Sequence, residues 1–229
     1  METHIMNLRT RSHLLVGLVA AMLGFTTYAM AGPPLICHPF TIGQAASLPA
    51  IDLNYQKKAG GYDLQNLTKD TLAILESNAP VLVRMETLRR ATLYARQDPQ
   101  VAKDLLTRLS ARAANAAADN IGALAWFDVG YLAETYKQGI ESGEPNPASG
   151  LDGYSWVRKA ISLRGQDPEM EFAAALITLT GSQSDHRNHL QKAAAGAKND
   201  PLLAQNLTSV FHQTISAMLN SAPAVGPTH

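Results

Sequence analysis

Cysteine is nearly absent from this chain of 229 residues, since Cys37 is the only one. A single cysteine excludes a disulfide within the chain and leaves three roles for Cys37: a buried thiol, a bond to a second molecule, or a ligand. Charge of one sign is also lacking, because 19 Lys and Arg residues balance 19 Asp and Glu residues. The whole chain therefore has no net attraction for nucleic acid, and we expect no nucleic-acid partner.

Strand-forming residues are also scarce. β-branched residues are few and alanine is abundant, which favours helix over strand. The motifs of a phosphate-binding loop, a zinc protease and a serine nucleophile are absent as well. Apolar residues still make up 46% of the chain, which excludes a disordered composition. We therefore expect an all-α fold, no catalytic residues and no cofactor.

The first 31 residues have the three-part pattern of a secretory signal peptide. Arg9 and Arg11 precede an uncharged apolar run of 12 residues, 14–25, and small residues follow at Ala29 and Ala31. The run is shorter than the roughly 20 residues that a membrane-spanning helix needs. We expect cleavage after Ala31 and a periplasmic or secreted protein, with an uncleaved anchor as the alternative. No later stretch is long and apolar enough for a stable membrane span after cleavage.

Breaker residues divide the rest of the chain. Proline and glycine are frequent in 32–62, which predicts an extended, irregular arm. Residues 63–220 are expected to form a helical repeat domain, and 221–229 a disordered tail. The expected helices cover 63–77, 80–96, 99–118, 121–141, 154–163, 168–181, 184–198 and 201–219.

A short sequence frame occurs three times along this helical region. "RATLYARQDP" (90–99), "KAISLRGQDP" (159–168) and "KAAAGAKNDP" (192–201) each have a basic residue, an alanine, six further residues and Asp-Pro. Aspartate is a preferred N-cap and proline suits the first helical position, so each copy predicts the end of one helix and the start of the next. The alanines lie 69 and 33 residues apart. The second spacing fits a two-helix repeat of about 34 residues, and the first is about twice that.

Two segments resemble helices of the tetratricopeptide-repeat superfamily. "LAWFDVGYLAETYKQG" (124–139) has Trp126 followed four residues later by Gly130, as in the first helix of that repeat. "GYSWVRKAISLRGQDPEMEFAAALI" (153–177) resembles a second helix, especially that of the SEL-like branch, through Trp156, Arg158, Lys159 and Ala160. The loop at 142–152 is longer than that pattern has. The resemblance implies a right-handed stack of antiparallel helix hairpins that binds proteins or peptides in a groove without catalysis.

Asp128 is a carboxylate among aromatic residues in "WFDVGY", so it needs a cationic partner or a binding role. A structural pair with an arginine of the second expected helix and contact with a ligand both remain open. If the second, fourth and sixth helices line a groove, the candidate binding residues are Arg84, Arg89, Asp128, Tyr131 and Glu171.

Cys37 and His38 are adjacent, and neighbouring residues of an extended segment point to opposite sides, which disfavours a catalytic pair. We expect instead that Leu35, Ile36, Cys37 and Phe40 dock the arm on the helical body. His186 and His189 share a helix face at i, i+3 and are expected to be solvated.

The leading hypothesis is an exported, non-catalytic module for a protein or peptide partner. One alternative is a metal-binding protein or enzyme that uses Cys37, His38, His186 and His189. The other alternative is a structural subunit of a cell-envelope complex.

Overall fold

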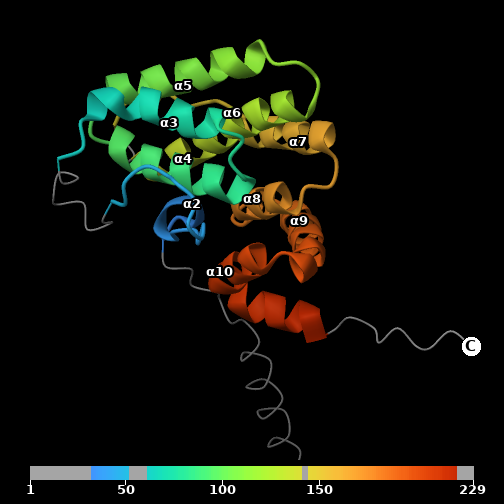
Figure 1. Cartoon of the computed structure of the whole chain (residues 1–229). Coiled ribbons are helices and arrows are strands. Elements are labelled where there is room, and N and C mark those ends of the chain that lie inside the picture. Colours follow the sequence, from blue (N-terminus) through green and yellow to red (C-terminus); the bar gives the residue numbers. More distant parts are fainter. Residues whose placement is uncertain (1–31, 52–60, 141–143, 221–229) are drawn as a thin grey trace, which may run out of the picture. The chain divides into compact units, whose positions relative to one another are not determined.

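A computed structural model describes residues 32–51, 61–140 and 144–220, with the side chains of 212–220 left out (Figure 1). These residues form helices and no strand, so the all-α prediction is confirmed. The helices are α2 Pro34–Cys37, α3 Leu67–Glu76, α4 Val81–Ala95, α5 Pro99–Ala114, α6 Asn120–Gly139, α7 Gly153–Arg164, α8 Pro168–Thr178, α9 Gln183–Gly196 and α10 Pro201–Asn220. Short 3-10 segments precede α3 at Leu64–Asn66 and α10 at Ala197–Asn199. The expected helices correspond in order to α3 through α10.

The three Asp-Pro pairs start helices as the sequence predicts. Asp98 accepts hydrogen bonds from the backbone N–H groups of the first turn of α5, and Asp167 does the same in α8. Asp200 caps α10 by accepting from Leu202 N at 3.0 Å and Leu203 N at 2.9 Å. Each carboxylate thus satisfies N–H groups that have no partner within the helix.

The alanines of the repeated frame are buried, as expected for positions where helices pack closely. Ala91, Ala160 and Ala193 are fully buried in α4, α7 and α9. A methyl side chain allows a neighbouring helix to approach closely, and any larger residue at these positions would overpack the core.

Helix α6 has the central position in the described body. It packs most closely on α7, and it also contacts α2, α4, α5 and α8 (Figure 1). The other close pair is α8 with α9. In a helical repeat stack each unit contacts only its neighbours. The packing around α6 does not establish that pattern, so the right-handed stack of hairpins stays a prediction.

The arm docks on the helices as expected, although its local structure differs from the expectation. Leu35, Ile36, Phe40 and Leu48 are buried, which confirms docking by apolar anchors. Residues 34–37 form one helical turn, α2, rather than extended chain. The turn fits the sequence, because Pro34 has a backbone angle suited to the first helical position. Cys37 is half-buried.

Two further predictions, the signal peptide at 1–31 and the tail at 221–229, lie outside the described residues. None of the helices in the described part of the chain combines the length and apolar character required to cross a bilayer.

Candidate functional site

Both tryptophans of the chain lie together at the surface between α6 and α7. Trp126 of α6 and Trp156 of α7 are half-buried, and their ring centroids are 6.4 Å apart. Lys159 places its ammonium group over the Trp126 ring, with Nζ 3.4 Å from the centroid. A cation over an indole ring is held by the negative face of the ring.

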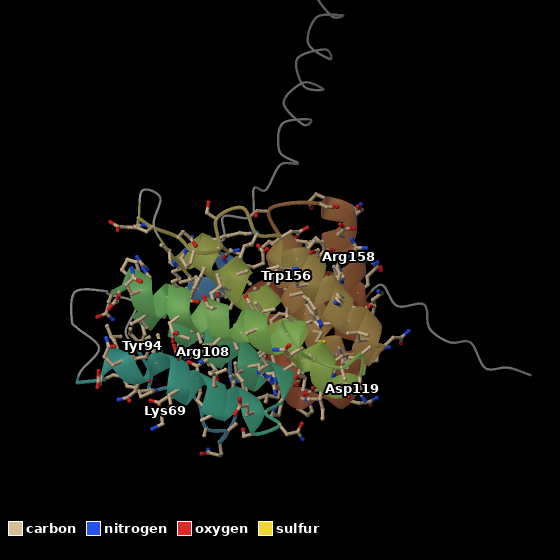
Figure 2. All side chains as sticks on the ribbon, turned by 90° about the horizontal axis from the view of Figure 1, so that it is seen from above. Lys69, Tyr94, Arg108, Asp119, Trp156 and Arg158 are labelled. Carbon is tan, nitrogen blue, oxygen red and sulfur yellow. The ribbon has the colours of Figure 1, made fainter. Side chains whose placement is uncertain are left out.

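The other flank of α7 carries a second ring with a second cation. The exposed Arg158 guanidinium lies over the Tyr154 ring, with Cζ 5.8 Å from the centroid. Figure 2 shows where Trp156 and Arg158 lie along α7. We call Trp126, Tyr154, Trp156, Arg158 and Lys159 the aromatic–basic face.

Two facing glycines bring α6 and α7 together beneath this face. A methyl group added to Gly130 would lie 2.7 Å from the carbonyl oxygen of Gly153, and one added to Gly153 would lie 2.4 Å from that of Gly130. The two backbones are therefore in direct contact. The Trp156 Cβ would lie 3.0 Å from the methyl on Gly130, so the same contact positions the indole.

Tyr154 is anchored from below by a hydrogen-bonded chain. Its hydroxyl pairs with His189 Nε2 at 2.8 Å, and His189 Nδ1 pairs with Glu171. Lys192 Nζ lies 3.2 Å from the other Glu171 oxygen. Burial is the main cause that raises the pKa of Tyr154, nearby carboxylates add to it, and Arg158 opposes it. The hydroxyl is therefore a neutral anchor and not an activated nucleophile.

The five residues that sequence reasoning assigned to a groove are all buried. The exposed fractions are 1% for Arg84, 3% for Arg89, 0% for Asp128, 0% for Tyr131 and 2% for Glu171. None of these side chains therefore presents itself to a partner in this structure. Each has internal neighbours instead, and a binding role for them stays a prediction.

Asp128 pairs with two arginines, which supports the structural pair that the sequence left open. Arg84 Nη1 and Arg112 Nη1 lie 2.7 and 2.8 Å from Asp128 Oδ2. The other carboxylate oxygen is buried without a hydrogen-bond partner among the described residues. Burial raises the pKa of Asp128 above its usual value, against the opposing effect of both guanidinium groups. Arg84 also donates to Leu75 O at 2.6 Å, so the cluster ties α4 and α6 to the end of α3.

Tyr131 lies near a second charged cluster. Its ring stacks on Phe127 with centroids 5.5 Å apart, and its hydroxyl is buried. Burial raises its pKa, and the nearby Glu86 carboxylate adds to the effect. Arg89 binds Glu86 through two nitrogens, at 2.7 and 2.9 Å.

The four residues of the metal alternative lie in different environments. His186 and His189 are buried, at 8% and 7% exposure, so the expectation of a solvated face is wrong. His186 Nδ1 bonds Ala175 O at 2.9 Å, and the His189 nitrogens are occupied by Glu171 and Tyr154. Cys37 and His38 belong to the arm. Across the described residues, no cluster of three or more histidine, cysteine or acidic side chains is arranged to hold a metal.

A shallow polar hollow of about 630 Å³ lies where α4, α8 and α10 begin. Carboxylates already occupy these helix N-termini: Asp167 and Asp200 cap their own helices, and Glu169 accepts from Leu82 N of α4 at 3.0 Å. Burial raises the pKa of Glu169. Because the N–H groups are satisfied by acidic side chains, the hollow does not attract an anion.

Sequence reasoning found parts of the aromatic–basic face without assembling it. The sequence singles out Trp126, Trp156, Arg158 and Lys159 only for the family resemblance. The signal that could have found the face is that both tryptophans flank the glycines that join α6 and α7.

Comparisons with protein-family models, curated proteins and solved structures give no match. The geometry of the chain itself is therefore the basis for assigning a function.

Proposed function

We propose that this protein is an exported, non-catalytic helical module that binds a protein or peptide partner through the aromatic–basic face. The observation that carries the proposal is the pair of half-buried tryptophans on α6 and α7, with the exposed Lys159 of α7 over the Trp126 ring. Tryptophan, tyrosine and arginine are the residues most enriched at binding hot spots. Export is supported by the signal-peptide pattern of 1–31.

The charges around the face favour an acidic partner. Among the described residues, the exposed Arg158 and Lys159 lie over rings, and some of the neighbouring carboxylates bind other groups. Glu134, for example, accepts from Lys137 and from the Tyr154 backbone N–H. We therefore specify the partner as a segment with carboxylates next to aromatic or aliphatic side chains.

The family resemblance supports the same class of function at a coarser level. The Trp126–Gly130 spacing and the Trp156–Arg158–Lys159–Ala160 run are the residues that resemble tetratricopeptide repeats. In this proposal Trp126, Trp156, Arg158 and Lys159 line an exposed face on α6 and α7, with Gly130 and Ala160 buried beneath it. The hairpin stack belongs to the proposal as well.

The test uses tryptophan fluorescence, because the chain has only two tryptophans and both belong to the face. The mature protein is titrated with acidic peptides that contain Leu or Phe, and with matched peptides in which Lys replaces every acidic residue. We expect the acidic peptides to shift the emission and the basic ones to leave it unchanged. Binding should weaken as salt is raised.

Variants assign the binding to the face. Trp156→Ala should weaken it at least about tenfold, as expected for a hot-spot residue, with Trp126 as the remaining reporter. Arg108→Ala is the matched control, since Arg108 is an exposed arginine of α5 whose side chain is 66% accessible and outside the face (Figure 2). Equal affinity of both variants, or a preference for the basic peptides, would overturn the proposal.

A further inference from the structure

The polar contacts of the arm with the body are made mainly through the arm's backbone. Asn206 of α10 is buried, and its side chain bonds both backbone groups of Thr41: Oδ1 accepts from Thr41 N at 2.8 Å and Nδ2 donates to Thr41 O at 2.9 Å. Gln138 of α6 accepts from Leu35 N at 2.9 Å. These bonds do not depend on which side chains the bound segment carries.

Helix α4 contributes charged groups to the same interface. Arg89 donates to Ile36 O at 3.0 Å, and Arg90 donates to Leu48 O. Glu86 binds both arginines, and it also accepts from the Phe40 backbone N–H at 3.0 Å. Arg89 was one of the residues that the sequence assigned to a groove.

Four apolar side chains anchor the arm between these polar contacts. Leu35, Ile36, Phe40 and Leu48 are at most 4% exposed. Most of the residues between Phe40 and Leu48 are exposed, with Ile42 and Ser47 half-buried. Buried anchors, exposed residues between them and side-chain bonds to the backbone are the features of a peptide held in a groove.

The charged network of Glu86, Arg89 and Arg90 is the kind expected on a surface that water solvates when the arm is detached. A buried Arg–Glu–Arg network costs desolvation energy, and well-packed apolar residues often replace such a network without loss. The cost is smaller for groups that water can solvate in an open state. Glu86 and Arg89, at 0% and 3% exposure, lie on the part of α4 that the arm contacts.

We propose that α4, α6 and α10 form a peptide-binding groove that the arm, residues 33–49, occupies in cis. The ligand class is a peptide that begins with a helical turn, as the arm does, carries apolar anchors at the spacing of Leu35, Phe40 and Leu48, and is recognised through its backbone. The groove is separate from the aromatic–basic face, so its test does not depend on the proposed function.

The test cuts the backbone between the arm and the body and keeps both parts in the sample. A site for a sequence-specific protease is placed within 52–60 of the full chain, and the folded protein is cut. A fluorescently labelled synthetic peptide of residues 33–50 is then added in excess. We expect the labelled peptide to exchange into the groove, measured by anisotropy, while the far-UV circular dichroism of the body is retained.

Changes in the peptide backbone identify the contacts without altering the protein. N-methylation at Thr41 removes the N–H that Asn206 accepts, and we expect at least about tenfold weaker exchange from the loss of a buried hydrogen bond. N-methylation at the exposed Gln44 is the matched control and should change affinity little.

A protein variant gives an independent reading. Asn206→Ala should weaken exchange, whereas Asn66→Ala should not, although both asparagines begin the triplet Asn-Leu-Thr. Asn66 is exposed and bonds Asp63 at 3.3 Å. Exchange only under conditions that also abolish the helical signal would overturn the proposal and make the arm a permanent part of the core. Equal exchange of the two N-methylated peptides would overturn it as well.

Discussion

Asp128 illustrates how a single buried carboxylate joins separate helices. Its Oδ2 atom is shared by Arg84 and Arg112, from α4 and α5. Arg84 is 1% exposed and also donates to backbone carbonyls, so the cluster holds α3 and α4 against α6. Removing the carboxylate leaves a buried cation without its counter-charge, which is more damaging than removing an exposed pair.

We therefore expect Asp128→Ala to lower the free energy of unfolding by about 3 kcal/mol. Chemical denaturation followed by circular dichroism measures the change. Asp104→Ala is the control, because Asp104 belongs to an ion pair with Arg108 whose side chains are 51% and 66% accessible. That variant should change stability by no more than about 0.5 kcal/mol.

The ligand contact that the sequence left open predicts a different result, in which Asp128→Ala weakens partner capture more than stability. A large drop in stability with unchanged peptide affinity would show that the residue is structural. Similar stability of the Asp128→Ala and Asp104→Ala proteins would contradict the buried pair.

At the scale of the element, the contact between α6 and α7 is set by glycine. Gly130 and Gly153 face each other so closely that either Cβ would meet a backbone carbonyl oxygen at less than 3 Å. Alanine is the better helix former by about 1 kcal/mol. The steric conflict at Gly130 involves backbone, which cannot move aside as a flexible side chain can, so it should outweigh that gain.

We expect Gly130→Ala to destabilise the protein by about 1 to 3 kcal/mol, the usual range for overpacking. Because Trp156 lies beside Gly130, the emission of the folded variant should shift as well. Ser162→Ala, at an exposed position of α7, is the control and should change neither stability nor emission. A stabilised Gly130→Ala protein would show that the two helices can separate freely.

Local chemistry explains which elements could be predicted from the sequence. Asp98, Asp167 and Asp200 accept hydrogen bonds from backbone N–H groups within three residues of themselves. The helix starts that they cap can therefore be predicted from the sequence. The buried alanines follow from the same frame. By contrast, Arg84 bonds Asp128 from 44 positions away, and Glu171 bonds His189 from 18 positions away. Asn206 bonds Thr41 from 165 positions away. Such pairs form only when the helices pack, so the periodicity of residues within one helix does not predict them.

The candidate site could be predicted only in part for the same reason. The sequence contains Trp126 and Trp156 but does not show that their helices touch through Gly130. His189 resembled a solvated residue because its partners, Glu171 and Tyr154, come from α8 and α7.

At the scale of the whole molecule, the described chain combines a helical body with an arm that enters it. The arm contacts α4, α6 and α10 through the backbone bonds of 35–48. Gly32, where the arm begins, is the residue that would follow the predicted signal cleavage after Ala31. The exported form would thus begin at the arm.

We expect protein recovered from the exported fraction to start at Gly32, as measured by intact mass and N-terminal sequencing. Replacing Ala29 and Ala31 with Gln should block the cleavage, because signal peptidase requires small residues there. An exported chain that retains residues 1–31 would support the uncleaved anchor instead.

The single thiol of the chain lies on the arm, half-buried beside Gly32, where a methyl group would meet Cys37 Sγ at 2.5 Å. The reactivity of Cys37 in the unaltered protein therefore reports how often the arm detaches from the body. The rate at which a bulky disulfide reagent modifies that sulfur, compared with the rate for the free peptide, sets an upper limit on the fraction of time that the segment is detached.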